Sequence, residues 1–166
     1  MNRRTTRTIA AALSLTAALA ISGCSSDSGS DSASGAKGDG KPAITVTDAF
    51  MPEPVNEKMA GAFMVIKNDS KTADKLTGAT SSLSDDLQIH ETKDQKMQQV
   101  QSMDVPANGE LKLERGGSHI MFMGLKNKPN VGDKVTIELR FEKADPVKVE
   151  LDVKERTYNS QNSMGH

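Results

Sequence analysis

Apolar and polar residues alternate along most of the chain after residue 42, and this alternation predicts β-strands. Pro, Gly, Asn and Asp separate the alternating segments, and a helical turn at 57–60 is the only helical element expected. Many short strands joined by turns indicate an all-β fold, a single antiparallel β-sandwich or barrel. The expected strands are 43–50, 61–67, 76–81, 87–92, 96–103, 110–114, 118–123, 134–142 and 146–154.

The first 23 residues have the pattern of a signal peptide. A basic start with three arginines precedes an apolar run that is too short to span a membrane. The run closes on Ile-Ser-Gly-Cys24, which resembles a bacterial lipobox. The sequence therefore predicts that residues 1–23 are removed and that Cys24, the single cysteine, is lipidated. A soluble secreted protein, cut nearby and left with a stray thiol, is the alternative.

Three further regions follow Cys24. Residues 24–41 form a predicted flexible linker, since ten of the seventeen residues from Ser25 to Lys41 are Ser or Gly. Residues 42–156 are long enough for one β-domain and too short for two. Residues 157–166 are polar, and we expect a disordered tail there.

The charge of the processed chain excludes some partners. Residues 24–166 carry 18 basic and 22 acidic side chains, a net charge of −4 with histidine neutral. No basic patch stands out, which argues against nucleic acid or anionic lipid as a partner. With Cys24 acylated, the domain has no free thiol, as suits an oxidising exterior.

Histidine and methionine provide the candidate chemistry. Only three histidines occur, and two of them, His90 and His119, lie near methionines. Met97 follows His90 by seven positions, and Met121 and Met123 follow His119 by two and four. The alternation around His90 places its side chain on the polar face of a half-buried strand. Imidazole and thioether form a soft, uncharged ligand set, and soft sulfur ligands select Cu(I).

The second cluster follows a Gly-Gly turn signal and is predicted to be a strand. There His119, Met121 and Met123 would share one face, and Ile120 and Phe122 would point to the core. Methionine is usually buried, so a His/Met/Met face outside the core needs a reason, and copper is one. A strand covered on both faces, with methionines filling gaps in the core, is equally compatible with the periodicity.

The combination resembles the copper motif of the PCu(A)C copper chaperones of bacterial envelopes, which reads His, a gap, Met, twenty-one residues, then His-x-Met. Twenty-one residues separate Met97 from His119 here. The flanking segments 105–109, 116–125 and 132–141 also match, and the resemblance covers about 43–153. It implies a cupredoxin-like β-sandwich and four copper ligands: His90, Met97, His119 and Met121.

The first gap departs from the family pattern, because six residues separate His90 from Met97 and the family usually has more. Met97 reaches the site if it begins the next strand of a tight hairpin, and Met103 is the substitute if it does not. Met123 falls where the family has no ligand. In the tail, Met164 and His166 would add ligands and favour Cu(II), although an inert tail is the simpler interpretation.

Other residues are candidates for the surroundings of the site. Met51 and Met59, in the segment between the first two strands, are candidates for its rim, although an ordinary loop explains them as well. A carboxylate or a backbone carbonyl is expected to orient each imidazole, and Glu91 and Glu114 are acidic candidates.

Enzyme chemistry is not expected. The sequence has no HExxH zinc motif, no phosphate-binding Gly loop and no CxxC motif, and Ser118 and His119 are adjacent strand residues that face opposite ways. A blue-copper centre needs a cysteine ligand, which the domain lacks. Two binding functions remain as alternatives: a metal-free surface lipoprotein that binds a protein or glycan, and a copper storage or resistance protein.

The expected function is thus a copper chaperone, lipid-anchored at Cys24 on the outer face of the cell membrane, that carries one Cu(I). The resemblance implies the copper-bearing subunit of cytochrome c oxidase as the acceptor, and another copper acceptor is the alternative.

Overall fold

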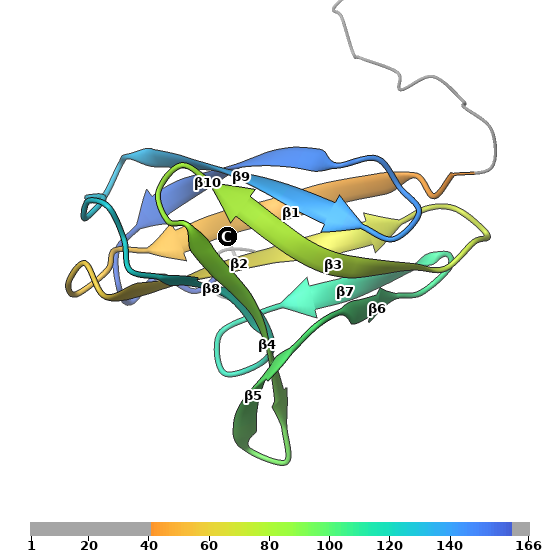
Figure 1. Cartoon of the computed structure of the whole chain (residues 1–166), viewed down its shortest axis with the longest axis horizontal. Helices are drawn as coiled ribbons and strands as arrows, with labels where there is room; N and C mark the ends of the chain where they lie inside the picture. The colour runs from red at the N-terminus through yellow and green to blue at the C-terminus, as the bar shows by residue number, and fades with distance from the viewer. Residues whose placement is uncertain (1–40, 161–166) are drawn as a thin grey trace, which may run out of the picture. The chain divides into compact units, whose positions relative to one another are not determined.

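The structure is a computed structural model that describes residues 41–160 (Figure 1). The predicted signal peptide, Cys24, the linker up to residue 40 and the tail candidates Met164 and His166 lie outside the described residues. Among residues 41–160, no helix is long and apolar enough to cross a membrane.

The described residues form ten strands, which confirms the all-β fold predicted from the alternating pattern. They are β1 (Ile44–Pro52), β2 (Met59–Asn68), β3 (Asp74–Ser81), β4 (Asp86–Lys93), β5 (Lys96–Val100), β6 (Met103–Val105), β7 (Gly109–Leu113), β8 (His119–Met123), β9 (Lys134–Phe141) and β10 (Val147–Lys154).

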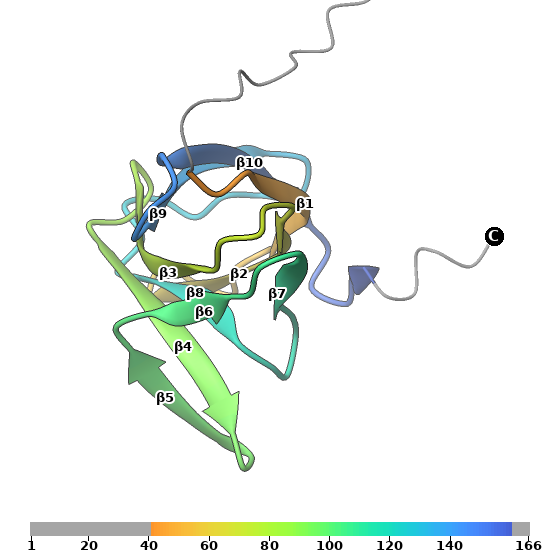
Figure 2. The ribbon, with the colours of Figure 1, turned by 90° about the vertical axis from the view of Figure 1, so that its right-hand side faces the viewer.

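The strands pair in the order β5-β4-β8-β2-β1-β10-β9-β3-β6. Strand β2 is long enough to pair with β8 along its first half and with β7 along its second half, on the same edge. The sheet curls so that β6 returns to lie beside β7 (Figure 2). One pair departs from the expected antiparallel arrangement, because β1 and β10 are parallel. These two strands are far apart in the sequence, so no tight turn dictates their direction.

The core lies inside the curled sheet and follows the alternation of the sequence. On β8, Ile120 and Phe122 are fully buried, as predicted for the core face of that strand. Ile137 and Leu139 on β9 and Leu151 on β10 are also fully buried. Each such side chain contributes about 1.5–3 kcal/mol relative to an exposed position. Because Ile120 and Phe122 point into the core, the alternating residues His119, Met121 and Met123 lie on the opposite side of β8.

Two expectations for local structure were wrong. The predicted strand 96–103 is two strands, because β5 pairs with β4 whereas β6 pairs with β3. The predicted helical turn at 57–60 is absent: residues 55–58 form bends, and Met59 begins β2. Alternation predicts extended chain over 96–103, but it does not identify the neighbouring strand.

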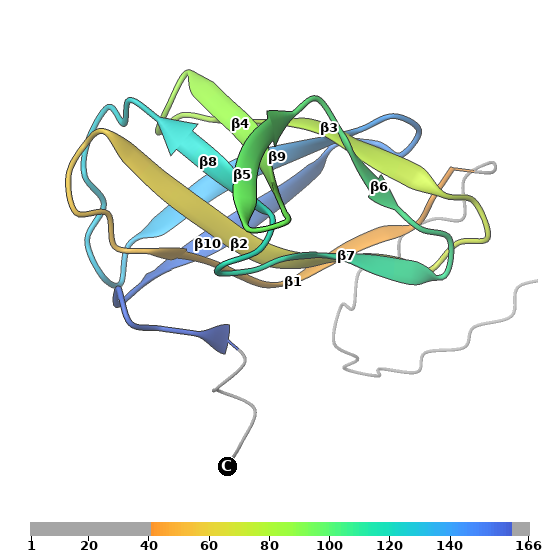
Figure 3. The same ribbon diagram turned by 90° about the horizontal axis from the view of Figure 1, so that it is seen from below.

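A tight hairpin joins β4 to β5 and projects from the body of the fold (Figures 1 and 2), so that it lies over the other strands when the fold is seen from below (Figure 3). Its two turn residues, Asp94 and Gln95, have φ values of 51° and 62°, as a two-residue hairpin turn of type I′ requires. Lys93 pairs with Lys96 across the turn, so Met97 is the second residue of β5. The short gap after His90 is therefore accommodated by a tight hairpin, as expected.

Candidate functional site: a His/Met face on strands β4, β5 and β8

His90 and His119 are direct partners in the ladder between β4 and β8. Side chains directly opposite each other in a sheet lie on the same side, and the two imidazole ring centroids are 5.5 Å apart. On β8, Met121 lies two residues beyond His119 and points to the same side. We call this outer side of β5, β4, β8 and β2, opposite the core, the site face.

Met97 also lies on the site face. It is the direct partner of Thr92, which lies two residues beyond His90 on β4. Directly opposite and diagonal positions on one face are about 5–8 Å apart, within reach of a long side chain. Met97 is 57% exposed. All four residues implied by the resemblance thus share one side of the sheet, with Met97 at its open edge.

The imidazole of His119 is oriented by a backbone carbonyl. His119 is 5% exposed, and its Nδ1 lies 3.0 Å from the oxygen of Gly117. A carbonyl only accepts, so Nδ1 carries the hydrogen and Nε2 keeps its lone pair for another partner. The N–H of Gly117 in turn donates to the carbonyl of Glu114, which closes the turn before β8. A backbone carbonyl was one of the two expected orienting groups.

Phe63 on β2 packs against the imidazole of His119. The two ring centroids are 5.9 Å apart. A Cβ at Gly61 would lie 3.1 Å from the ring of Phe63, so the absence of a side chain at Gly61 lets the phenyl ring take this position. Phe63 thereby contributes to the burial of His119, while Met121, the direct partner of Gly61, stays half-buried.

A chain of side-chain hydrogen bonds fixes the imidazole of His90. The amide nitrogen of Gln88 donates to Oδ2 of Asp86 at 3.0 Å, and its amide oxygen lies 3.0 Å from Nε2 of His90. Because an ionised carboxylate only accepts, the amide must turn its oxygen toward His90, and Nε2 must carry the hydrogen. Nδ1 of the neutral ring is then the atom with a free lone pair.

That Nδ1 atom is buried and has no hydrogen-bond partner among residues 41–160. Burying an unpaired polar atom costs about 1–3 kcal/mol. Burial, and secondly the charge of His119, also lower the pKa of His90 below its usual value of 6.5. A neutral imidazole with a vacant lone pair is the form that binds a metal ion.

The other sequence candidates fall in different places. Met103 is 7% exposed and packs in the core on β6 beside Leu76, so the structure does not bring it to the histidines. Met51 is fully buried in the same core. Met123 and Met59 lie on the site face, as direct partners on β8 and β2.

Gln88 and Asp86 were missed by the sequence analysis. Gln88 orients His90, whereas the carboxylate of the acidic candidate Glu91 accepts from Gln98 instead. The signal was present, because Gln88 precedes His90 by two residues and must share its face of the strand.

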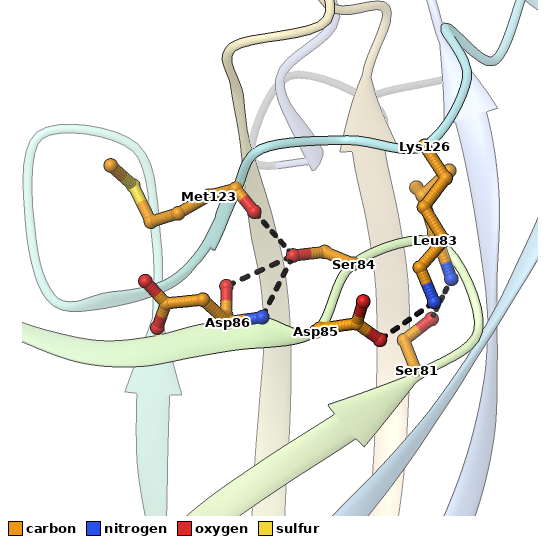
Figure 4. Close-up of polar contacts among 7 residues, drawn as sticks. All are labelled: Ser81, Leu83, Ser84, Asp85, Asp86, Met123 and Lys126. Atoms are coloured by element: carbon orange, nitrogen blue, oxygen red, sulfur yellow. Dashed lines mark hydrogen bonds and ion pairs between the residues drawn. The ribbon is translucent and has the colours of Figure 1, made fainter.

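The register between β4 and β8 is secured by the buried hydroxyl of Ser84 (Figure 4). It lies within hydrogen-bond distance of the carbonyls of Met123 and Asp86 and accepts the N–H of Asp86. Asp86 and Met123 are direct ladder partners. Ser84 therefore joins the start of β4 to the end of β8, and this register places His90 opposite His119.

The donor set fits a soft metal ion better than a hard one. It consists of two imidazoles and two thioethers, all uncharged. Among the described residues, no group of three or more His, Cys, Asp or Glu side chains is placed to hold a metal ion.

Comparison with known proteins places the chain in a family. The model of the family described as "Putative lipoprotein LpqE-like" matches residues 44–153. The chain belongs to the LpqE-like family. It is also 35% identical over 136 residues to "Putative lipoprotein Lxx21020" of Leifsonia xyli subsp. xyli, across 79% of this chain and 80% of that protein.

Solved structures of PCuAC domains share the fold of this LpqE-like protein. The "Copper-bound PCuAC domain from PmoF2" superimposes with a TM-score of 0.61 at 23% identity, covering 68% of this chain and 92% of that one. The "Solution structure of CuI-DR1885 from Deinococcus radiodurans" matches with a TM-score of 0.57 at 29% identity, covering 75% and 85%. The resemblance to the PCu(A)C family expected from the His/Met spacing is confirmed.

Proposed function

We propose that this LpqE-like protein is a copper chaperone that carries one Cu(I) on its site face. His90 and His119 supply imidazole nitrogen, and Met97 and Met121 supply thioether sulfur. The observation that carries the proposal is the pairing of His90 with His119, their ring centroids 5.5 Å apart, together with the orphaned Nδ1 of His90. A bound ion would give that buried atom the partner it lacks.

The hydrogen bonds assign a different nitrogen to each imidazole. Copper on Nε2 of His119 keeps the bond from Nδ1 to Gly117. Copper on Nδ1 of His90 keeps the bond from Nε2 to Gln88, whereas copper on Nε2 would break that bond and leave Nδ1 unpaired. We therefore infer Nδ1 ligation at His90 and Nε2 ligation at His119.

The exposure of the ligands supports transfer rather than storage. Met97 is 57% exposed at the free edge of β5, while His119 is 5% exposed beneath Phe63. An acceptor's ligand can replace Met97 first and His119 last, so the ion need not leave all its ligands at once. A surface site of this kind suits a carrier of single ions.

Two finer proposals concern where the ion goes. Similarity to a lipoprotein and the lipobox at Cys24 support an anchor on the outer face of the cell membrane. Some similar structures are described as copper-bound and Cu(I)-bound PCuAC proteins, which supports copper as the cargo. We propose the copper-bearing subunit of cytochrome c oxidase as the acceptor, from the PCu(A)C resemblance alone.

An anaerobic Cu(I) titration of residues 25–166 against a chromophoric competitor tests the proposal. We expect one tight equivalent, lost in His119→Ala/Met121→Ala and retained in Met51→Leu, which removes a core thioether instead. Thermal unfolding of each variant checks that it folds, and His90→Gln serves as a second ligand variant if the double variant does not. No competition from the folded wild-type domain would overturn the proposal.

A further inference from the structure

Three thioethers gather at the end of the site face that lies away from Met97. Met59 on β2 is the direct partner of Met123 on β8, and Met121 lies two residues from Met123 on the same face. Direct partners have Cβ atoms about 4.5–5.5 Å apart, and residues two apart on one strand are also neighbours. Met59 and Met123 are not among the four ligands proposed above.

These thioethers are accessible, unlike the methionines of the core. Met59 is 49% exposed, and Met121 and Met123 are half-buried. By contrast, Met64, on the opposite face of β2, is 1% exposed and packs in the core. Gap-filling in the core explains Met64 but not Met59, because a side chain that is 49% exposed gives up about half of the benefit of burying an apolar side chain.

The backbone that carries these side chains is held firmly. The N–H groups of Gly124 and Leu125 donate to the carbonyls of Lys58 and Glu57 at 2.7 and 2.8 Å, immediately beside the pair of Met59 and Met123. On the other side of β8, Ser84 contacts the carbonyl of Met123 (Figure 4). Hydrogen bonds on both sides of the Met59–Met123 pair therefore hold the backbone that carries these thioethers.

The carboxylate of Asp86 lies beside these thioethers, in line with Met123 and Met59 across three neighbouring strands. Asp86 on β4 is the direct partner of Met123, and its carboxylate and the Met123 side chain extend in the same direction in Figure 4. The amide of Gln88 holds one carboxylate oxygen at 3.0 Å. Among residues 41–160, no Lys or Arg forms a salt bridge with Asp86. This carboxylate can offset the charge of a monovalent cation beside it.

We propose that Met59, Met121 and Met123 form a second, weaker Cu(I) site that serves copper uptake, with Asp86 balancing its charge. Three thioethers are a soft ligand set that suits Cu(I). Since Met121 belongs to both sites, an ion can exchange Met59 and Met123 for His119 and His90 without leaving Met121. No electron moves in this exchange. The thioether site itself stands on its own observations, and only the direction of transfer rests on the proposed function.

The test follows the methionine methyl groups by NMR during an anaerobic Cu(I) titration of residues 25–166 labelled with [13C-methyl]methionine. In the His90→Ala/His119→Ala variant, which lacks both imidazoles, we expect the Met59 and Met123 signals still to shift with Cu(I). The signals of the core residues Met51 and Met64 should stay in place. Adding Met59→Leu should abolish the Met123 shift, while the matched control Met64→Leu, on the other face of the same strand, should preserve it.

Two results would overturn the second site: a Met59 signal that does not move at excess Cu(I), or a Met123 shift that survives Met59→Leu. If the histidine double variant fails to fold, the same signals are followed in the wild-type chain beyond its first equivalent. Failure of the second site is distinct from failure of the proposed function. In the former, the wild-type chain still takes up one tight equivalent; in the latter, it takes up none.

Discussion

The two histidines of the site face differ in what holds them. His119 is buried beneath Phe63 and bonded to the backbone of its own turn, so its orientation follows from the fold. His90 is half-buried and depends on the side chain of Gln88, which in turn depends on Asp86. At the scale of single residues, we therefore expect the site to be most sensitive to changes around His90.

Replacing Gln88 by Leu should weaken Cu(I) binding about 10–100-fold, the usual effect of removing a group that orients a metal ligand. It should also release the imidazole tautomer of His90 in the metal-free protein. Long-range 15N–1H NMR spectra of the ring should show the hydrogen on Nε2 in the wild type and a mixture in the variant. Gln98→Leu, on the opposite face of β5, is the matched control. A wild-type ring protonated on Nδ1 would contradict the assigned orientation.

Lowering the pH should destabilise the metal-free protein partly through His90. Burial, and secondly His119, lower the pKa of His90 below 6.5 in the folded state, so the unfolded chain takes up the proton first. This contribution to the free energy of unfolding is constant above about pH 6.5. It falls as the pH drops from 6.5 toward the lower folded pKa. Urea unfolding at pH 7.5 and 5.5 should show a smaller loss of stability in His90→Gln than in the wild type. An equal loss in both would contradict the assignment.

At the scale of elements, the hairpin of β4 and β5 supports Met97 as the third proposed ligand. The tight turn at Asp94 and Gln95 places Met97 on the site face at the edge of the sheet. After β5 the chain no longer pairs with β4. It continues into β6, which pairs with β3, and Met103 on β6 packs in the core, away from the site face. The spacing to His119 and the topology thus favour the same methionine.

Met97→Ala should therefore lower Cu(I) affinity by at least roughly 10–100-fold. That is the usual cost of losing a group that only orients a metal ligand, and the loss of a ligand itself should cost no less. Its effect on thermal stability should be small, since Met97 is 57% exposed. Met103→Leu keeps the core volume and should leave the affinity unchanged, at a cost of less than about 1.5 kcal/mol in stability. Competition titrations and thermal unfolding of both variants check this. The reverse order of affinities would assign the ligand to Met103.

At the scale of the whole molecule, the C-terminal segment is attached to the domain beyond its last strand. Tyr158 packs edge-on against Phe50 with ring centroids 4.9 Å apart, and Nη1 of Arg115 donates to the carbonyls of Arg156 and Tyr158. Phe50 also contacts Phe63, the residue that covers His119. Packed rings thus connect Tyr158 to His119 through Phe50 and Phe63.

We propose that Met164 and His166 add ligands for Cu(II), for which imidazole is the better donor. Deleting residues 161–166 should weaken Cu(II) binding and leave Cu(I) binding unchanged, and it preserves the contacts of Tyr158. Isothermal titration with each oxidation state measures both. Unchanged Cu(II) affinity in the truncated protein would show that the tail is inert.

The sequence predicts much of this molecule because side chains alternate along strands. Alternation located the strands and the core side of Ile120 and Phe122, and the His/Met spacing identified the family. Alternation does not predict which strands pair with each other or in which direction they run. The pairing of His90 with His119, the parallel β1 and β10 and the division of 96–103 are all set by long-range pairing. The sequence places Gln88 on the same face as His90, but which way its amide points depends on its hydrogen-bond partners in the fold.

X-ray absorption at the copper K-edge, on protein loaded anaerobically with one equivalent of Cu(I), tests the central claim most directly. We predict a first shell of two nitrogen and two sulfur scatterers, from His90, His119, Met97 and Met121. A shell without sulfur, or one without nitrogen, would contradict the mixed His/Met site on which this account rests.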